Sequence, residues 1–192
     1  MTLLSVENLE VSFPTSRGRI KVVDNLSFDL GRERLGIVGE SGSGKSMTGR
    51  AILRLIRPPG QIAGRVTFEG TDLMALSERR MRRMRGARIS MIMQDPRYSL
   101  NPVMTVGTQI AEALGVHETL PGRAIRARVR DMLEAVRIDD PDRVARLYPH
   151  EVSGGMGQRV MIAMMLIPRP GLLIADEPTS ALDVSVRGMF CA

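Results

Sequence analysis

The chain has 192 residues, of which 43% are hydrophobic and 25% charged; these proportions are ordinary for a soluble globular protein and disfavour the disordered and fibrous classes. Its longest apolar run, residues 160–167, is much shorter than the roughly 18 residues that a membrane-spanning helix needs, and residues 1–11 lack the basic start and long apolar core of a secretory signal, so we expect a cytoplasmic protein. The positive charge comes almost wholly from arginine, because Lys21 and Lys45 are the only lysines. The net charge of +6 means that nucleic acid must be considered as a partner.

The N-terminal third is predicted to be rich in β-structure. Loosely alternating apolar residues predict strands over residues 3–13 and 22–30. A further strand is expected over residues 65–69, directly before the turn at Gly70-Thr71.

A glycine-rich loop follows the apolar run Leu35–Val38, which is suited to a buried strand. The loop completes the pattern G-x-x-x-x-G-K-S with Gly39, Glu40, Ser41, Gly42, Ser43, Gly44, Lys45 and Ser46. Glycines allow backbone N–H groups to close around phosphate oxygens, Lys45 supplies a positive charge, and the Ser46 hydroxyl can coordinate Mg²⁺. Residues 46–56 predict a helix whose N-terminus faces the same anion, with Ile52, Leu53 and Ile56 toward the sheet. A chance match in a flexible turn is disfavoured by this strand and helix, so the loop predicts binding of a nucleoside triphosphate.

The densest basic cluster comes next along the chain and consists of Arg79, Arg80, Arg82, Arg83, Arg85 and Arg88. Such a cluster can bind a phosphate backbone. Met81 and Met84 lie three residues apart within it, however, which favours a short amphipathic helix with a solvated outer face. The cluster contains no aromatic residue, so base stacking is not supported, and a basic face toward a membrane or an acidic partner stays open.

Strands and helices alternate through the rest of the chain. A short strand over residues 88–94 ends in the polar Gln94 and is followed by a loop, 95–102. Helical spacing covers residues 105–115, 123–137 and 157–167, and a buried strand over 172–175 closes the pattern. The alternation implies an α/β core with a parallel sheet. We therefore read residues 1–192 as a single domain with a β-rich part (1–94), a helical part (95–157) and a C-terminal part (158–192).

Two acidic residues, Asp176 and Glu177, end the last predicted strand. Asp176 can hold Mg²⁺ through water, and Glu177 can polarise the water that attacks a terminal phosphate. An acidic strand end that only faces solvent is the alternative, and the presence of the phosphate-binding loop makes it the less favoured one.

A second glycine-rich turn is formed by Ser153, Gly154, Gly155 and Met156, immediately before a predicted helix. Glycines at a helix start expose backbone donors, and the Ser153 hydroxyl adds another, so the turn fits a second phosphate-binding surface that serves a nucleotide held by a partner subunit. A plain serine N-cap explains these residues equally well.

Five segments of the chain, taken in order, resemble the motifs of the ATP-binding subunit of ABC transporters. They are Gly39–Ser46, Gln94, Tyr148–Met156, Leu172–Glu177 and Ser180–Asp183, and the resemblance covers residues 3 to about 187. The run from Gln94 to Pro102 and the Tyr148–Met156 string are similar to the oligopeptide, dipeptide and nickel importers. The resemblance implies an α/β fold: a P-loop NTPase core of ABC type with an N-terminal antiparallel β sub-region and an inserted helical sub-region.

The resemblance also implies a role for each matching residue. Gly39 to Ser46 would form the Walker A loop, Asp176 would be the Walker B carboxylate, and Glu177 would be the general base. Gln94 would sense metal and water, so that Ser46, Gln94 and Asp176 form the Mg²⁺ set, and Asp183 would communicate across a dimer. The signature residues Ser153, Gly154, Gly155 and Met156 would contact ATP held by the opposite subunit. Phe13 would stack on adenine, and an edge-strand aromatic in a small core is a nearly equal reading of the same residue.

The chain departs from the family pattern in several places, two of which bear most on its function and stability. The family's switch histidine is expected some tens of residues beyond Asp183, but the chain ends at Ala192, and His117 and His150 both precede Glu177. We therefore expect a truncated domain that lacks this histidine. Gly157 stands where relatives usually carry arginine, and a glycine inside a helix costs about 1 kcal/mol relative to alanine.

The leading hypothesis for function is an ATP-binding subunit that energises a bacterial peptide-type ABC importer by ATP-dependent dimerisation and hydrolysis. The resemblance implies ATP and Mg²⁺ as cofactors and a second ATP-binding subunit, two permease subunits and, indirectly, a substrate-binding protein as partners. It places the chain at the cytoplasmic face of the inner membrane as a peripheral protein. One alternative is a truncated remnant that binds nucleotide without turnover. Another is a soluble ABC ATPase acting on nucleic acid, which is disfavoured because the chain has neither long coiled-coil insertions nor paired zinc cysteines.

Overall fold

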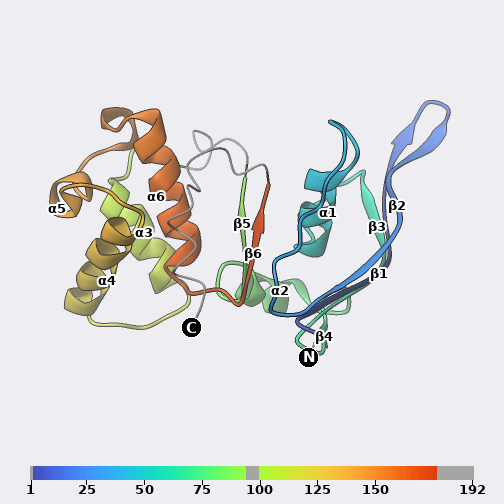
Figure 1. Ribbon diagram of the computed structural model, residues 1–192, viewed down its shortest axis with the longest axis horizontal. Coiled ribbons are helices and arrows are strands. Elements are labelled where there is room, and N and C mark those ends of the chain that lie inside the picture. The colour runs from blue at the N-terminus through green and yellow to red at the C-terminus, as the bar shows by residue number, and fades with distance from the viewer. Residues whose placement is uncertain (1, 94–99, 177–192) are drawn as a thin grey trace. The chain divides into compact units, whose positions relative to one another are not determined.

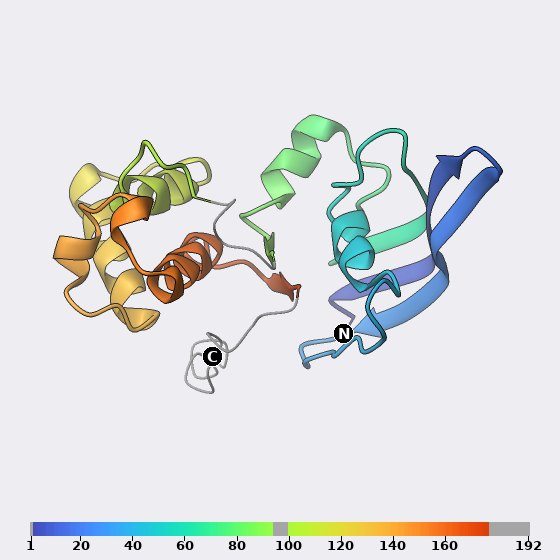
Figure 2. The same ribbon diagram turned by 90° about the horizontal axis from the view of Figure 1, so that it is seen from above.

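The computed structural model describes residues 2–93 and 100–176 of the chain. It contains two compact units, residues 1–82 and 83–192, which we describe in turn. The ribbon in Figure 1 and the second view in Figure 2 show the β-rich character of the first unit and the helical character of the second.

The first unit is built on a four-stranded antiparallel sheet in the order β2-β1-β3-β4. The strands are β1 (Leu4–Thr15), β2 (Gly18–Leu30), β3 (Gln61–Phe68) and β4 (Thr71–Asp72). The pairing of β1 with β3 shifts register between Glu7 and Glu10, next to Asn8, which has a φ of 47°. Gly64 lies against the backbone of Asn8 with a φ of 97°, and a side chain at position 64 would collide with that backbone. The three strands predicted for this region are thus present.

Helix α1 (Lys45–Ile52) packs on β1 and β2 and buries Ile52 and Leu53, as predicted. The helix ends four residues earlier than expected, because Arg54 adopts a left-handed conformation with a φ of 53°. The Arg54 guanidinium donates to the carbonyl oxygens of Leu73 (3.2 Å) and Leu76 (2.6 Å). Ile56 therefore lies beyond the helix and is only half-buried.

Helix α2 (Glu78–Met84) carries four of the six arginines of the cluster and runs into the start of the second unit. Met81 is fully buried, whereas four arginines of the helix are exposed: Arg79, Arg80, Arg82 and Arg83. The amphipathic helix favoured from the methionine spacing is confirmed.

The strand expected over Leu35–Val38 is wrong. Residues 34–40, all of which the structure describes, form no strand, and the Val38 side chain is 96% exposed. An apolar run has the composition of a buried strand, but a parallel strand exists only where neighbouring strands accept and donate its backbone hydrogen bonds. No ladder among the described residues includes this segment.

The second unit contains a two-stranded parallel sheet and a set of helices. Strand β5 (Ile89–Ile92) pairs with β6 (Leu172–Ala175), with Ile89 opposite Leu172 and Ile92 opposite Ala175. The helices are α3 (Val106–Gly115), α4 (Gly122–Ala135), α5 (Pro141–Val144), the 3₁₀ helix η2 (Pro149–Glu151) and α6 (Gly154–Leu166). The parallel strands and the three longer helices agree with prediction; α5 and η2 are additional.

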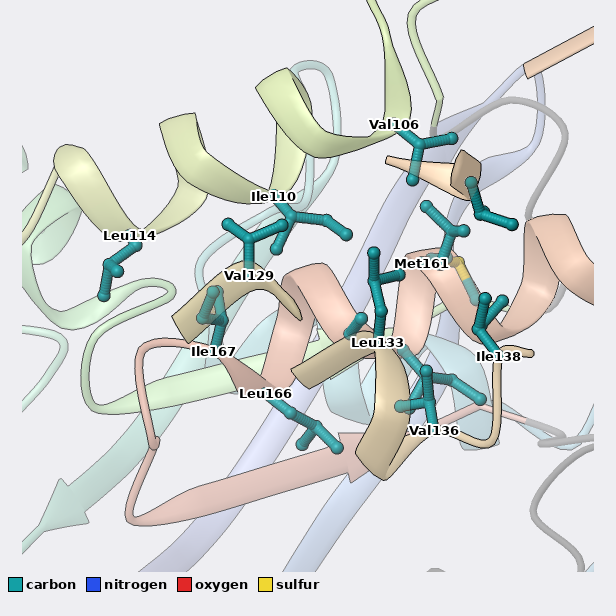
Figure 3. Close-up of a cluster of buried hydrophobic side chains, with 14 of the residues drawn as sticks. Val106, Ile110, Leu114, Val129, Leu133, Val136, Ile138, Met161, Leu166 and Ile167 are labelled. Atoms are coloured by element: carbon teal, nitrogen blue, oxygen red, sulfur yellow. The ribbon is translucent and has the colours of Figure 1, made fainter. Parts of the chain in front are cut away.

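One hydrophobic core joins these helices. Figure 3 shows Ile110 of α3, Leu133 of α4 and Met161 of α6 side by side in it, and all three are buried. Helix α6, which follows Ser153, packs against α3, α4 and β5. These contacts hold the helix in place within the core of this unit. Among the residues that the structure describes, no helix has the length and apolar character needed to cross a membrane.

Candidate functional site: the glycine-rich loop and the start of helix α1

The glycine-rich loop leads directly into α1. Ser43 N–H donates to the Glu40 carbonyl (3.2 Å), which closes a turn, and Gly42 and Gly44 have φ values of 82° and 89°. Such left-handed conformations favour glycine strongly over residues with a side chain. Two of the three glycines of the motif are therefore required by the backbone path alone.

The Lys45 side chain turns back across this loop. Its ammonium group donates to the carbonyl oxygens of Gly39 (2.7 Å) and Glu40 (2.6 Å) and lies 3.5 Å from the Ser43 hydroxyl. These three contacts match the three N–H donors of an ammonium group. The structure thus places the charged group that is predicted to bind phosphate in contact with the loop itself.

Gly44 is the N-cap of α1 and lies against the backbone of β2. A Cβ atom at position 44 would collide with the Val22 carbonyl oxygen and would come within 3.1 Å of the Val23 side chain. Thr48 stabilises the first turn of α1, because both its N–H (2.9 Å) and its hydroxyl (3.1 Å) donate to the Gly44 carbonyl. The contact with β2 was missed from the sequence, since no local pattern shows which strand a loop will approach.

The N-terminus of α1 has the properties of an anion site. Gly44 supplies no side-chain cap, and the first turn of this helix, which the structure describes in full, contains no acidic residue. The helix dipole therefore meets no negative charge from its own first turn, and Lys45 adds a positive one. Backbone N–H groups, a positive charge and a neutral hydroxyl at Ser46 are donors that suit a phosphate group better than a carbonyl or apolar ligand.

Asp176 immediately follows β6 and is only 8% exposed. Its backbone N–H donates to the Ile92 carbonyl (2.9 Å), so the sheet hydrogen bonding continues to this residue. The predicted carboxylate therefore lies at the carboxyl end of a parallel strand, where ligands of α/β proteins commonly bind.

Ser153 is the N-cap of α6, and its hydroxyl accepts a hydrogen bond from Met156 N–H (3.3 Å). Gly154 and Gly155 begin the helix with open space where their side chains would lie. Just upstream, Tyr148 N–H donates to the Glu151 carboxylate (2.7 Å), and the rings of Tyr148 and His150 stack at 5.7 Å. Ser153 thus acts as the N-cap of α6, which was one of its two interpretations. Phosphate binding by the same turn stays a prediction.

Phe13 lies near the end of β1 opposite Ile20 of β2. Its ring is half-buried and close to Gly60, where a Cβ would come within 2.6 Å of the ring. Because β1 lies between β2 and β3, the edge-strand reading of Phe13 is wrong, and the predicted stacking on adenine stays a prediction. The remaining predicted residues, Gln94, Glu177 and Asp183, lie outside the described residues.

Comparison with known proteins shows what this arrangement resembles. The family profile described as "ABC transporter" matches residues 23–180. The chain is 50% identical over 191 residues to the oligopeptide transport ATP-binding protein OppD of Bacillus subtilis, and 50% identical over 191 residues to the dipeptide transport ATP-binding protein DppD of the same organism. In each case 98% of this chain is matched, and it corresponds to 53% and 57% of the relative, so the chain spans about half the length of these proteins.

Solved structures with the same fold are also ATP-binding cassettes. One is a dimeric, post-hydrolysis state of the cassette MJ0796 bound to ADP and Pi, with a TM-score of 0.83 at 26% identity; the match covers 97% of this chain and 79% of that one. Another is cbiO1 from Clostridium perfringens, part of the ABC transporter complex cbiONQ, with a TM-score of 0.72 at 27% identity, covering 98% of this chain and 70% of that one. The predicted fold class, a P-loop core of ABC type, is confirmed.

Proposed function

Because the chain belongs to the ABC transporter family, we propose that it is the ATP-binding part of a subunit that energises a bacterial peptide-type importer. The observation that supports this proposal is the loop from Gly39 to Ser46, in which the Lys45 ammonium group contacts the loop carbonyls where α1 begins. The relatives named for oligopeptide and dipeptide transport supply the substrate class.

In this proposal the triphosphate of ATP takes over the hydrogen bonds that Lys45 makes to its own loop. The ammonium group needs only a side-chain rotation to leave the carbonyl oxygens of Gly39 and Glu40, and phosphate oxygens are stronger acceptors because they are charged. The binding energy thus comes from replacing neutral acceptors by charged ones at a helix N-terminus.

The residues that the proposal assigns to Mg²⁺ have the donor chemistry that this ion prefers. The Ser46 hydroxyl and the Asp176 carboxylate are hard oxygen donors of the kind that Mg²⁺ prefers, and this ion is usually held by one or two protein groups together with phosphates and water. In this proposal phosphate oxygens and water complete the coordination. When bound, the ion would neutralise charge on the phosphate oxygens.

Dimerisation is the proposed mechanical step. The Ser153 turn would cover the nucleotide held by a second ATP-binding subunit, and the dimeric form of the similar cassette MJ0796 supports the pairing of two such subunits. Glu177 would polarise the attacking water, Gln94 would sense metal and water, and Asp183 would lie at the subunit interface. ATP would close the pair and hydrolysis would reopen it, which moves two attached permease subunits at the cytoplasmic face of the inner membrane.

Light scattering of the purified protein tests this proposal. With Mg²⁺ and a non-hydrolysable ATP analogue, the wild-type molar mass should double, and the Lys45→Ala variant should stay monomeric. The thermal midpoint of both proteins, measured without nucleotide, controls for folding. A wild-type protein that remains monomeric at saturating analogue would contradict the proposal.

A further inference from the structure

The excess positive charge of the chain is concentrated in one short segment. Residues 79–88 contain six arginines and no acidic residue. Of the 27 basic residues, the 21 outside this segment equal the 21 acidic residues in number, so the segment alone accounts for the net charge of +6. Charge concentrated in this way attracts anions to one place on the protein rather than to its whole surface.

Helix α2 displays four of these arginines on one exposed side, which we call the arginine face: Arg79, Arg80, Arg82 and Arg83. Successive residues of an α-helix are 100° apart, so the four positions cover an arc of about 160°. Met81 lies opposite the middle of that arc and is fully buried. Among the described residues, Arg82 pairs with Glu78 at 3.7 Å, and the other three arginines of the face form no ion pair.

This arrangement works against the stability of the helix itself. Arg79 lies one turn from both Arg82 and Arg83, and like charges at these spacings repel each other. A surface that only has to be solvated commonly carries charges of both signs. The arginine face therefore indicates a negatively charged partner, whose charge would relieve the repulsion.

The residues before α2 hold the arginine face in place. The Asp72 carboxylate accepts from Met74 N–H (2.8 Å), and the Ser77 hydroxyl accepts from Arg80 N–H (3.4 Å) in the first turn of the helix. The Arg54 guanidinium also binds two carbonyl groups of the same segment. The backbone that leads into the arginine face is thus ordered without a partner, which lowers the entropic cost of binding one.

We propose that the arginine face binds the anionic phospholipid headgroups of the membrane surface directly. The inference rests on the proposed function, which puts the chain at the cytoplasmic face of the inner membrane. The negative surface potential of anionic lipids attracts each arginine that comes near it, and this attraction requires no match between individual charges. The arginine face thereby holds the subunit against lipid, independently of its contacts with other subunits.

The size and composition of α2 favour lipid over nucleic acid. Seven residues span about 10 Å, which faces about three phosphates of one nucleic-acid strand, whereas strongly salt-dependent DNA binding involves about 6–10 phosphate contacts. Residues 79–88 also contain no aromatic side chain on which a base could stack. A bilayer presents headgroups in two dimensions, so all four arginines of a convex face can lie near negative charge. Because Met81 is buried, the contact is electrostatic rather than an apolar insertion.

Two triple variants with the same change of net charge test the proposal. The first replaces three arginines of the arginine face by glutamine: Arg79→Gln, Arg80→Gln and Arg83→Gln. The matched control replaces three exposed arginines of α4: Arg123→Gln, Arg126→Gln and Arg130→Gln. Glutamine has nearly the helix propensity of arginine, so both variants should keep the wild-type thermal midpoint.

Co-sedimentation with vesicles measures the binding. The vesicles contain about one third phosphatidylglycerol in phosphatidylcholine, and pure phosphatidylcholine vesicles are the reference. At about 0.1 M salt the α2 variant should bind at least about thirtyfold more weakly than wild type, since each arginine contributes about fivefold, whereas the α4 variant should stay within about threefold. Wild-type binding should fall at least about tenfold at about 0.5 M salt, because salt screens the attraction.

Arginine footprinting locates the contact on the wild-type protein, so the test does not depend on the variants being folded. Phenylglyoxal, which modifies exposed guanidinium groups, should react more slowly with Arg79 and Arg80 when the anionic vesicles are present. Its reaction with Arg123 and Arg126 should be the same with and without vesicles.

Four results would overturn the inference. They are equal wild-type binding to anionic and neutral vesicles, equal weakening in both triple variants, unchanged labelling of Arg79 and Arg80 on vesicles, and binding of a duplex RNA that depends on the arginine face and exceeds vesicle binding. The last result would assign the face to nucleic acid. Light scattering with the ATP analogue needs no membrane, so a protein that dimerises but does not bind vesicles refutes this inference alone. One that binds vesicles but does not dimerise refutes the proposed function instead.

Discussion

Gly44 and Val22 lie in such close contact that the first helical turn after the phosphate-binding loop rests on the backbone of β2. The N-cap of α1 is therefore positioned by a strand more than twenty residues earlier in the chain. The loop does not act alone as a sequence motif, because its geometry depends on this support from the antiparallel sheet.

Gly44→Ala should abolish nucleotide binding, and Gly42→Ala should reduce it only moderately. Both glycines have left-handed φ values, 89° and 82°, which cost an alanine about 1 kcal/mol or more. At position 44 the added methyl would also collide with Val22, whereas at position 42 no atom lies within 4 Å of it. Isothermal titration with Mg·ATP measures the difference, and equal affinities for the two variants would contradict this role of Val22.

Ser153→Ala and Ser153→Asp separate the two readings of the second glycine-rich turn. Alanine removes the acceptor for Met156 N–H and should destabilise the fold by about 1 kcal/mol, whereas aspartate keeps an N-cap acceptor. If the turn also contacts phosphate on a partner, the negative charge of aspartate should prevent ATP-dependent dimerisation without loss of stability. A Ser153→Asp protein that dimerises normally would leave only the capping role.

Gly157→Ala should stabilise the protein. Gly157 lies inside α6, and an added methyl would meet Leu100 and Val152 at 3.9 and 4.0 Å, which is ordinary contact. The expected gain is about 1 kcal/mol, or about 2–4 °C in the thermal midpoint. Gly107→Ala is the control with opposite sign, because a methyl there would lie 2.8 Å from the Ala145 carbonyl oxygen. A gain of stability in both variants would contradict this account of the helix packing.

Arg128→Met should destabilise the protein by about 1–2 kcal/mol. The Arg128 guanidinium pairs with Glu118 (3.0 Å) and donates to the Ile167 carbonyl at the end of α6 (3.0 Å), which loses its partner in the variant. Arg130 lies on the same helix, and its ion pairs with described residues are exposed, at 3.5 and 3.8 Å, so Arg130→Met should change stability by less than about 0.5 kcal/mol. Chemical denaturation measures both, and equal losses would show that the bond to Ile167 contributes nothing.

Local patterns predicted most of the elements because their causes are local. The Met81 spacing identified the buried side of α2, and the apolar repeat identified the helix that Ser153 caps. The strand expected over 35–38 failed because hydrogen-bonding partners for a strand come from distant segments.

The same distinction holds within the candidate site. The Gly39–Ser46 motif predicted a glycine-rich loop that leads into a helix, since both follow from the loop's own residues, and phosphate binding by Lys45 stays a prediction. The contact of Gly44 with Val22 joins residues far apart in the sequence, so no local pattern predicts it.

Calorimetric titration of Mg·ATP into the wild-type and Lys45→Met proteins tests the central claim most directly, namely that the Lys45 ammonium group binds the triphosphate. Methionine keeps the length of the side chain and removes its charge and donors. We predict saturable binding of one nucleotide per wild-type chain and a loss of at least about 100-fold in affinity for Lys45→Met, with the thermal midpoint unchanged. Equal affinity of the two proteins for ATP would contradict the account.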